Sequence, residues 1–172
     1  MRENPSFCEV QRLLQPVALV RPAISEDARR LLGASAKISG HLGLPVRQAD
    51  WYQAEGAIEP CNEVEGAHYT VNGVAVEIAN PIRIGRSEFG RIIVDGSTGH
   101  IVYVDESGET QLINTSLERF LYFIGRFHQS ADKGFEDTSK LKADLEDADP
   151  SPLQNPDGVW SLSIEEAEAG LY

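Results

Sequence analysis

Two cysteines and four histidines are the side chains of this sequence best suited to bind a metal ion. A zinc-dependent deaminase needs a His or Cys ligand beside a glutamate and a downstream Pro-Cys-x-x-Cys, because zinc takes its ligands at fixed spacings. Pro60-Cys61 is followed by Asn-Glu-Val, so the second cysteine of that motif is missing. The histidines are scattered, and no His-Glu-x-x-His occurs. We therefore expect no metal site.

Nucleophilic and phosphate-binding motifs are also missing. No Gly-x-Ser-x-Gly occurs, and no glycine loop leads from a strand into a helix with a lysine, so a P-loop and a dinucleotide site are excluded. Asp105 and Glu106 are adjacent in a turn, where alternating side chains point apart and are unsuited to paired acid–base work. We expect no catalytic residue and no cofactor. An enzyme acting on a small substrate is the third alternative, which a deep pocket with convergent polar groups would favour.

The two cysteines could pair only if the fold brings them together, and the start of the chain bears on whether they do. The N-terminus lacks the apolar run of a signal peptide, and the longest apolar stretches are far too short to span a membrane. In such a chain Cys8 and Cys61 are expected to be free, buried thiols. We therefore expect a cytoplasmic protein with no membrane partner. The oligomeric state is not predicted.

Charge is the strongest signal of the composition. The chain has 15 basic and 27 acidic side chains, a net charge of −12, which argues against nucleic acid as a partner. Residues 143–172 contain eight acidic side chains and no Lys or Arg, whereas residues 1–50 contain seven basic and five acidic ones. One interpretation is a solvated face that keeps the protein soluble. The other is an acidic surface that steers a basic protein partner into contact.

The pattern of predicted strands and helices indicates an α+β fold. Residues 82–127 show four short strands separated by turn residues and followed by an amphipathic helix, with Thr115 and Glu118 as its capping box. Short links favour antiparallel neighbours, so we expect a meander in an antiparallel or mixed sheet of five to six strands. Asn72-Gly73 between β-rich runs predicts a type I′ hairpin that joins this meander and buries one face.

Helices are expected from both ends of the chain. Residues 6–14 form a short candidate helix, and Ser25 is a plausible cap for a second apolar stripe, which Gly33 interrupts. Residues 46–66 are either a long loop or contain a short strand. After Asp132 we expect a helix that docks weakly, and then a last helix anchored by Trp160. The chain of 172 residues is most simply one domain.

The order of these motifs resembles the SUKH superfamily. The resemblance rests on Ile84-Gly85, on IIVD, on the TGHIVYVD hairpin and on INTSLERFLYFI. The tail DPSPLQNPDGVWSLSIEEAEAGLY is similar to the closing D-P…W-S…E-E…G-L pattern of the fourth SUKH subgroup. The segment ARRLLGASAKISGHLGLP is similar to that subgroup's helix ending in G-L-P.

This resemblance implies a non-enzymatic module. Most bacterial members are immunity proteins that bind a cognate polymorphic toxin, often a nuclease or nucleic-acid deaminase, and block its active site or substrate surface. Such a toxin has a basic surface that an acidic inhibitor could occupy. The alternative is a SUKH-type regulatory or scaffold module that binds some other cellular protein.

No motif of the superfamily transfers a contact site onto this chain, so the expected partner-binding residues rest on charge alone. We expect them at two places, the turn after residue 104 and the acidic stretch after residue 143. They are Asp105, Glu106, Glu109, Asp144, Glu146, Asp147 and Asp149.

Overall fold

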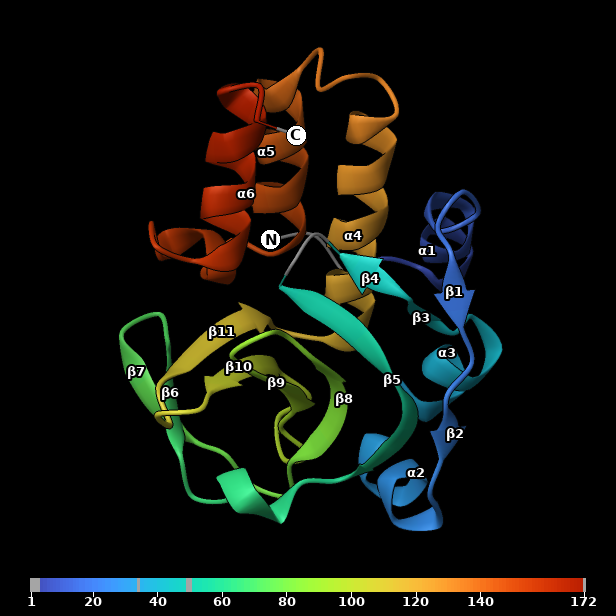
Figure 1. Ribbon diagram of the computed structural model, residues 1–172, viewed down its shortest axis with the longest axis vertical. Coiled ribbons are helices and arrows are strands. Elements are labelled where there is room, and N and C mark those ends of the chain that lie inside the picture. Colours follow the sequence, from blue (N-terminus) through green and yellow to red (C-terminus); the bar gives the residue numbers. More distant parts are fainter. Residues whose placement is uncertain (1–3, 34, 49–50, 172) are drawn as a thin grey trace.

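The computed structural model describes residues 4–33, 35–48 and 51–171 (Figure 1). Its centre is a seven-stranded sheet in the order β11-β10-β9-β8-β5-β2, with β4 also paired to β5. The sheet is mixed because β2 and β5 run parallel, while the other pairs are antiparallel. The α+β fold predicted from the sequence is confirmed. The strand count exceeds the expected five to six because two-residue strands extend the sheet.

The predicted meander and its helix form the scaffold. The four strands and the helix are β8 (Ile82–Arg86), β9 (Gly90–Val94), β10 (Ile101–Asp105), β11 (Thr110–Asn114) and α4 (Leu117–Ala131). One stripe of α4 is buried against the sheet and includes Leu117, Phe120 and Ile124. Burying each such side chain stabilises the fold by about 1.5–3 kcal/mol, so this unit anchors the molecule.

The cap of α4 differs from the prediction by one residue. Ser116 is the cap, and its hydroxyl accepts a hydrogen bond from the backbone N–H of Arg119 at 3.2 Å. The capping box predicted from Thr115 and Glu118 is wrong, because the Thr115 hydroxyl donates to the Asp149 carboxylate at 2.9 Å instead. The hydrogen bond to a distant residue therefore prevents Thr115 from acting as the cap that the local sequence predicts.

The segment that the sequence left open, residues 46–66, contains the longest strand. β5 (Tyr52–Pro60) pairs with β8 on one side and with β2 (Ala23–Ile24) and β4 (Arg47–Gln48) on the other. Its register with β8 shifts between Ala54 and Glu59, which marks a bulge. A strand with such an irregularity shows only a broken apolar alternation, so its sequence did not distinguish it from a loop.

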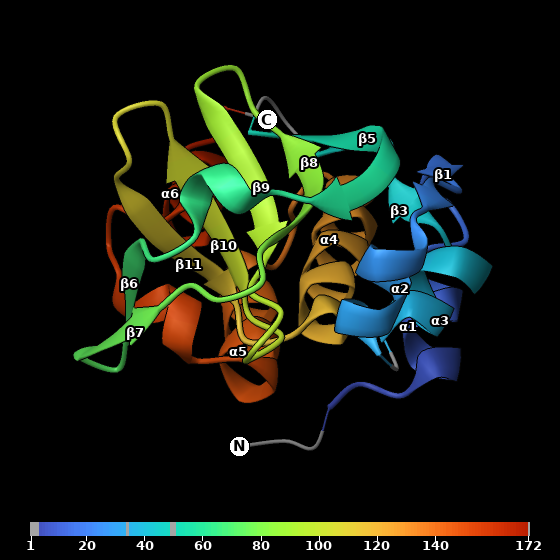
Figure 2. The same ribbon diagram turned by 90° about the horizontal axis from the view of Figure 1, so that it is seen from below.

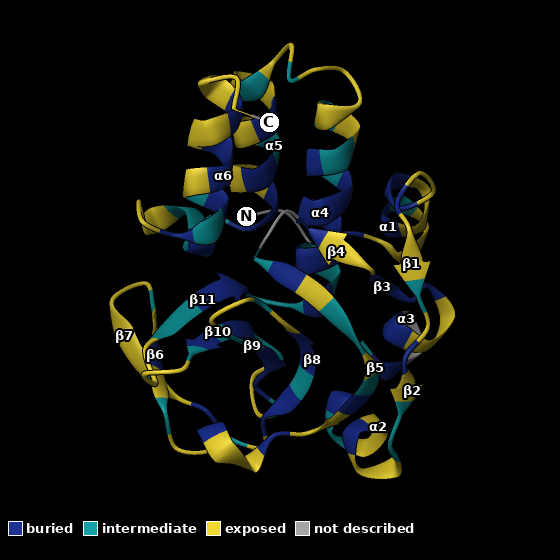
Figure 3. Cartoon of the chain, viewed as in Figure 1, coloured by how far each residue is buried: buried dark blue, intermediate teal, exposed yellow. Residues whose placement is uncertain are grey.

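The hairpin β6 (His68–Val71) and β7 (Val74–Glu77) is confirmed, with positive φ at both Asn72 and Gly73 as a type I′ turn requires. It forms a sheet of its own and does not join the meander. With η1 (Asn62–Val64) it covers the sheet face opposite α4, around Ile93 and Val102. The predicted buried face is only partly present: Ile78 is buried, but Val74 at the hairpin tip is 63% exposed. The tip extends beyond this second core (Figures 1 and 3).

The N-terminal helices pack beside α4 and β5. They are α1 (Phe7–Leu13), α2 (Glu26–Leu32) and α3 (Ser35–His41), with the short strands β1 (Leu19–Val20) and β3 (Leu44–Pro45) pairing between them. Ser25 caps α2 as predicted, since its hydroxyl accepts from the N–H of Ala28 at 3.2 Å. The apolar stripe is divided into α2 and α3 at Gly33, whose φ of +53° ends α2.

The C-terminal layer comprises α5 (Thr138–Ala148), η2 (Ser151–Gln154) and α6 (Val159–Glu168). The helices α5 and α6 stand beside α4, and η2 lies against β11 and α6 (Figure 1). Trp160 is fully buried and meets Phe123 edge-on with ring centroids 5.2 Å apart. Leu141 and Leu145 of α5 are also buried, so the prediction that this helix docks weakly is wrong. Although α5 carries many charged side chains, these two buried leucines are enough to pack it against the core.

Candidate functional site

Two neighbouring turns place an acidic surface at one end of the meander. The turn from β8 to β9 and the turn from β10 to β11 lie at the same end because antiparallel strands reverse there (Figure 2). The backbone N–H of Glu106 donates to the carbonyl of Phe89 at 3.0 Å, which ties the turns together. We call residues 87–89 and 105–109 the strand-end surface.

Asp105 stabilises the β10–β11 turn of this surface through side-chain hydrogen bonds. Its Oδ1 accepts hydrogen bonds from the Ser107 hydroxyl and from the N–H of Glu109, each at 2.8 Å. The bond from Ser107 lowers the pKa of Asp105, with backbone N–H groups of the turn acting in the same direction. Asp105 therefore shapes the turn, and the side chains presented to solvent are those of Glu88, Glu106 and Glu109.

An exposed aromatic side chain belongs to the same two turns, next in sequence to Glu88. Phe89 is 64% exposed at the tip of the β8–β9 turn. The sequence leaves two roles open for Trp51, Tyr52 and Phe89, exposed contact residues or core packing, and core packing is the default expectation. It holds for Tyr52, which is buried, and for Trp51, which is partly buried against the core, but not for Phe89. Aromatic side chains are enriched in protein interfaces, so an exposed Phe89 is typical of a protein contact.

The acidic residues of α5 lie elsewhere and differ among themselves. Figures 1 and 2 both place α5 far from the β10–β11 turn. Glu146 and Asp147 are exposed. Asp144 is largely covered, with a side chain 25% exposed, and forms ion pairs with Arg126 and Lys140. The charge predicted for the α5 surface is thus partly neutralised.

Asp149 is buried, with a side chain only 1% exposed. It accepts hydrogen bonds from Asn114 Nδ2 at 3.2 Å and from the N–H and hydroxyl of Thr115 at 2.8 and 2.9 Å. Asn114 Oδ1 in turn accepts from Trp160 Nε1 at 3.0 Å. Asp149 therefore joins the C-terminal layer to the start of α4, and we leave it out of the surface that could meet a partner.

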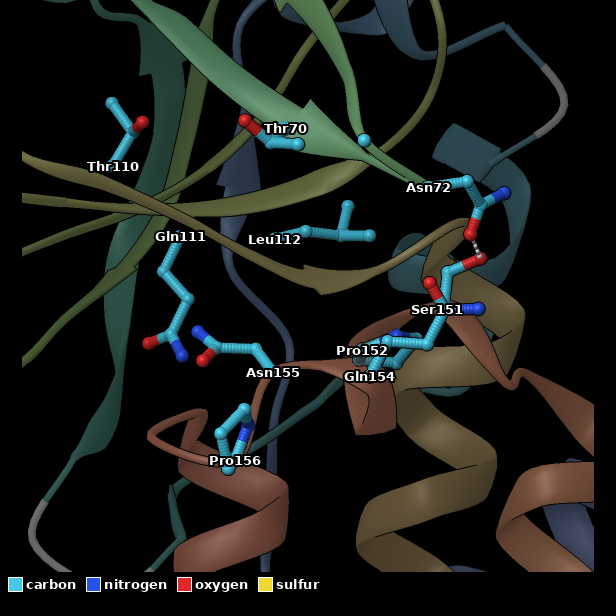
Figure 4. Close-up of a pocket in the computed structure, with 11 residues that line it drawn as sticks. Thr70, Asn72, Thr110, Gln111, Leu112, Ser151, Pro152, Gln154, Asn155 and Pro156 are labelled. Carbon is cyan, nitrogen blue, oxygen red and sulfur yellow. Dashed lines mark hydrogen bonds between the residues drawn. The ribbon is translucent and has the colours of Figure 1, made fainter.

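A groove opens beside the strand-end surface, between the β6–β7 hairpin, β11 and η2 (Figure 4). Its volume is about 460 Å³. Four carboxamides line it: Asn72, Gln111, Gln154 and Asn155. Figure 4 shows Gln111 and Asn155 facing one another across the groove, and Ser151 donating to Asn72 Oδ1 at 3.2 Å. None of the described residues that line it is ionisable.

A buried polar cluster holds the hairpin that forms one wall of this groove. The Tyr69 hydroxyl lies 3.0 Å from Asp95 Oδ2 and 2.7 Å from His100 Nδ1. Asp95 also accepts from the N–H of Ala79 at 3.2 Å and from the Thr98 hydroxyl at 2.7 Å. In the sequence, His100 is one of four scattered histidines and stands beside a predicted turn, with no neighbour that indicates a partner. Its partner Tyr69 is 31 positions away, so no local pattern could reveal the cluster.

The described residues lack two features that other functions would require. In that part of the chain, no three side chains of His, Cys, Asp or Glu gather as a metal site would require. Nor does any helix there combine the length and apolar character needed to cross a membrane. Cys61 is a free buried thiol as predicted, whereas Cys8 is free but exposed, because it lies on the solvent side of α1.

Comparison with known proteins places the chain in a family. The family model described as SUKH-4 immunity protein matches residues 11–166. This match spans the N-terminal helices, the meander and the C-terminal layer. Comparisons with curated proteins and with solved structures gave no match. Since the family model covers most of the sequence, the chain belongs to the SUKH-4 immunity protein family.

Proposed function

We propose that this chain is a cytoplasmic immunity protein that neutralises one cognate toxin by direct, non-catalytic binding. Family membership supports toxin immunity in general. Direct binding is supported most by the strand-end surface, where an exposed aromatic and three exposed glutamates sit on hydrogen-bonded turns. Rigid turns lose little conformational freedom on binding, and an aromatic anchor with a charged rim matches the anatomy of protein interfaces.

The toxin that fits this surface is a nuclease or a nucleic-acid deaminase. Such an enzyme must present a basic surface to a phosphate backbone, and the immunity protein would cover it. The net charge of −12 raises the association rate with a basic partner and repels nucleic acid itself. We propose accordingly that the partner is the toxin domain and that the chain binds neither nucleic acid nor a membrane.

We also propose that the whole chain acts as one SUKH domain. The C-terminal layer shares a hydrophobic core with α4 through Trp160, and Asp149 hydrogen bonds to the residues just before that helix. A tail so connected is expected to unfold together with the sheet.

The experiment that tests the surface is a matched charge reversal. The strand-end variant carries Glu106→Lys and Glu109→Lys, and its control carries Glu146→Lys and Asp147→Lys on α5, which changes the net charge equally. Association with a catalytically inactive toxin domain, encoded beside this chain, is followed by stopped flow at low ionic strength. We expect the strand-end variant to associate roughly tenfold more slowly, and the control to change much less. Equal slowing of both variants would show that only net charge matters and would remove the strand-end surface from the proposal.

A further inference from the structure

We propose that the carboxamide groove between the β6–β7 hairpin, β11 and η2 receives an extended, uncharged segment of the toxin's polypeptide backbone. This inference rests on the proposed function and adds the chemical class of what the groove holds. Nothing in the family match assigns the groove a role.

The groove offers the hydrogen-bonding groups that a peptide backbone needs. A carboxamide carries one acceptor oxygen and an NH₂ donor, the same complement as a peptide group. The Gln154 side chain has no hydrogen-bond partner among the described residues, and the Gln111 side chain has one long contact of 3.4 Å from Nε2 to the carbonyl of Asp157. Both side chains are therefore available to pair with a backbone laid along β11. Leu112 and Pro152, both buried, give the groove an apolar floor.

Other ligand classes fit less well. A phosphate or another anion would lack a cationic partner, because none of the lining residues that the structure describes is ionisable. A nucleobase is usually held by stacking on an aromatic side chain, and the described residues that line the groove include none. Glu109 and Asp157 lie next in sequence to the lining residues Thr110 and Pro156, and their charge repels nucleic acid.

Position and rigidity support the same assignment. Thr110 lines the groove directly after Glu109, so one partner can touch the groove and the strand-end surface together. The Thr110 hydroxyl donates to the His68 carbonyl, and Tyr69 is held by Asp95, so the hairpin wall is fixed before any partner arrives. A preformed groove avoids the cost of ordering its walls on binding.

The test replaces two carboxamides by side chains of similar size that cannot hydrogen bond, in the variant Gln111→Leu with Gln154→Leu. Gln11→Leu is the matched control, an exposed carboxamide on α1 at the opposite side of the molecule (Figures 1 and 2). Affinity for the inactive toxin domain is measured by calorimetry, and urea unfolding checks that each variant is folded. We expect the double variant to bind at least roughly tenfold more weakly, about 1.4 kcal/mol, and the control to bind like the wild type.

Hydrogen exchange of the toxin in the complex supplies the second readout. The inference predicts one contiguous toxin segment that is protected by the wild type and loses that protection with the double variant. If the folded double variant binds as tightly as the wild type, the groove assignment is overturned while the proposed function stands. If the wild type itself forms no complex, the proposed function fails and the groove assignment fails with it.

Discussion

At the scale of single residues, the motif that closes this sequence is structural. Asp149-Pro150 and Trp160 are part of the tail pattern that resembles the fourth SUKH subgroup. In the structure, the side-chain amide of Asn114 connects Asp149 to Trp160. Asn114 donates to Asp149 and accepts from the Trp160 indole. Arg119 Nη1 lies 3.8 Å from the Asp149 carboxylate, which places a positive charge beside this buried acid. The family pattern thus identifies a joint between helices and sheet, and gives no information about partner contacts.

Replacing Asp149 by Asn should therefore destabilise the fold. The new NH₂ group would face the donors of Asn114 and Thr115, which lose a charged acceptor in a buried position. We expect a loss of about 3 kcal/mol in the free energy of unfolding, measured by urea denaturation. Asp147→Asn, at an exposed position two residues earlier, is the control and should stay within about 0.5 kcal/mol of the wild type. Equal stabilities of the two variants would show that the Asp149 network contributes little.

At the scale of elements, a half-buried histidine, His100, helps to hold the β6–β7 hairpin to the sheet. His100 lies beside the Tyr69 hydroxyl. Burial lowers the pKa of His100 below its ordinary value of about 6.5, although the Asp95 carboxylate opposes this shift. Burial also lowers the pKa of His128 on α4. In both cases the unfolded chain takes up a proton more readily than the folded one.

The sign of the pH dependence follows from these shifts. The stability contributed by neutral His100 is complete above about pH 6.5 and declines as the pH falls below that value. Urea unfolding from about pH 7.5 to about pH 5.5 should therefore show decreasing stability, and His100→Asn should flatten the curve. His128 accounts for a remaining slope. His68→Asn, an exposed position on β6, is the control. A His100→Asn curve as steep as that of the wild type would contradict this account.

The elements themselves could be predicted where their signals are local. The strands from Ile82 to Asn114, the stripe of α4 and the Asn72-Gly73 turn depend on spacing and turn chemistry within a few residues. The failures lie where distant contacts decide. The strand β5 depends on pairing with β2 and β8, which lie on its two sides. Thr115 does not cap α4, because its hydroxyl donates a hydrogen bond to Asp149, 34 positions away.

At the scale of the whole molecule, the acidic side chains differ in exposure and in bonding partners, and the fold decides which role each one has. Of the seven acidic positions predicted as contacts, Glu106, Glu109, Glu146 and Asp147 are exposed. Asp105 shapes a turn, Asp144 is ion-paired and Asp149 is buried. Charge counted along the sequence cannot separate these roles, because each depends on which partner the fold brings near. Glu88 and Phe89 were not among the seven predicted positions for the same reason: only strand pairing places their turn beside Glu106.

The proposed function requires that this protein occludes its toxin and transforms nothing. It is tested most directly by titrating the toxin's activity on its nucleic-acid substrate with increasing amounts of purified immunity protein, at a toxin concentration far above the dissociation constant. Stoichiometric binding predicts that activity falls linearly and reaches zero at about one equivalent. Complete loss of activity at a small fraction of one equivalent, increasing with incubation time, would show turnover and contradict the account. Full activity in the presence of excess immunity protein would contradict it equally.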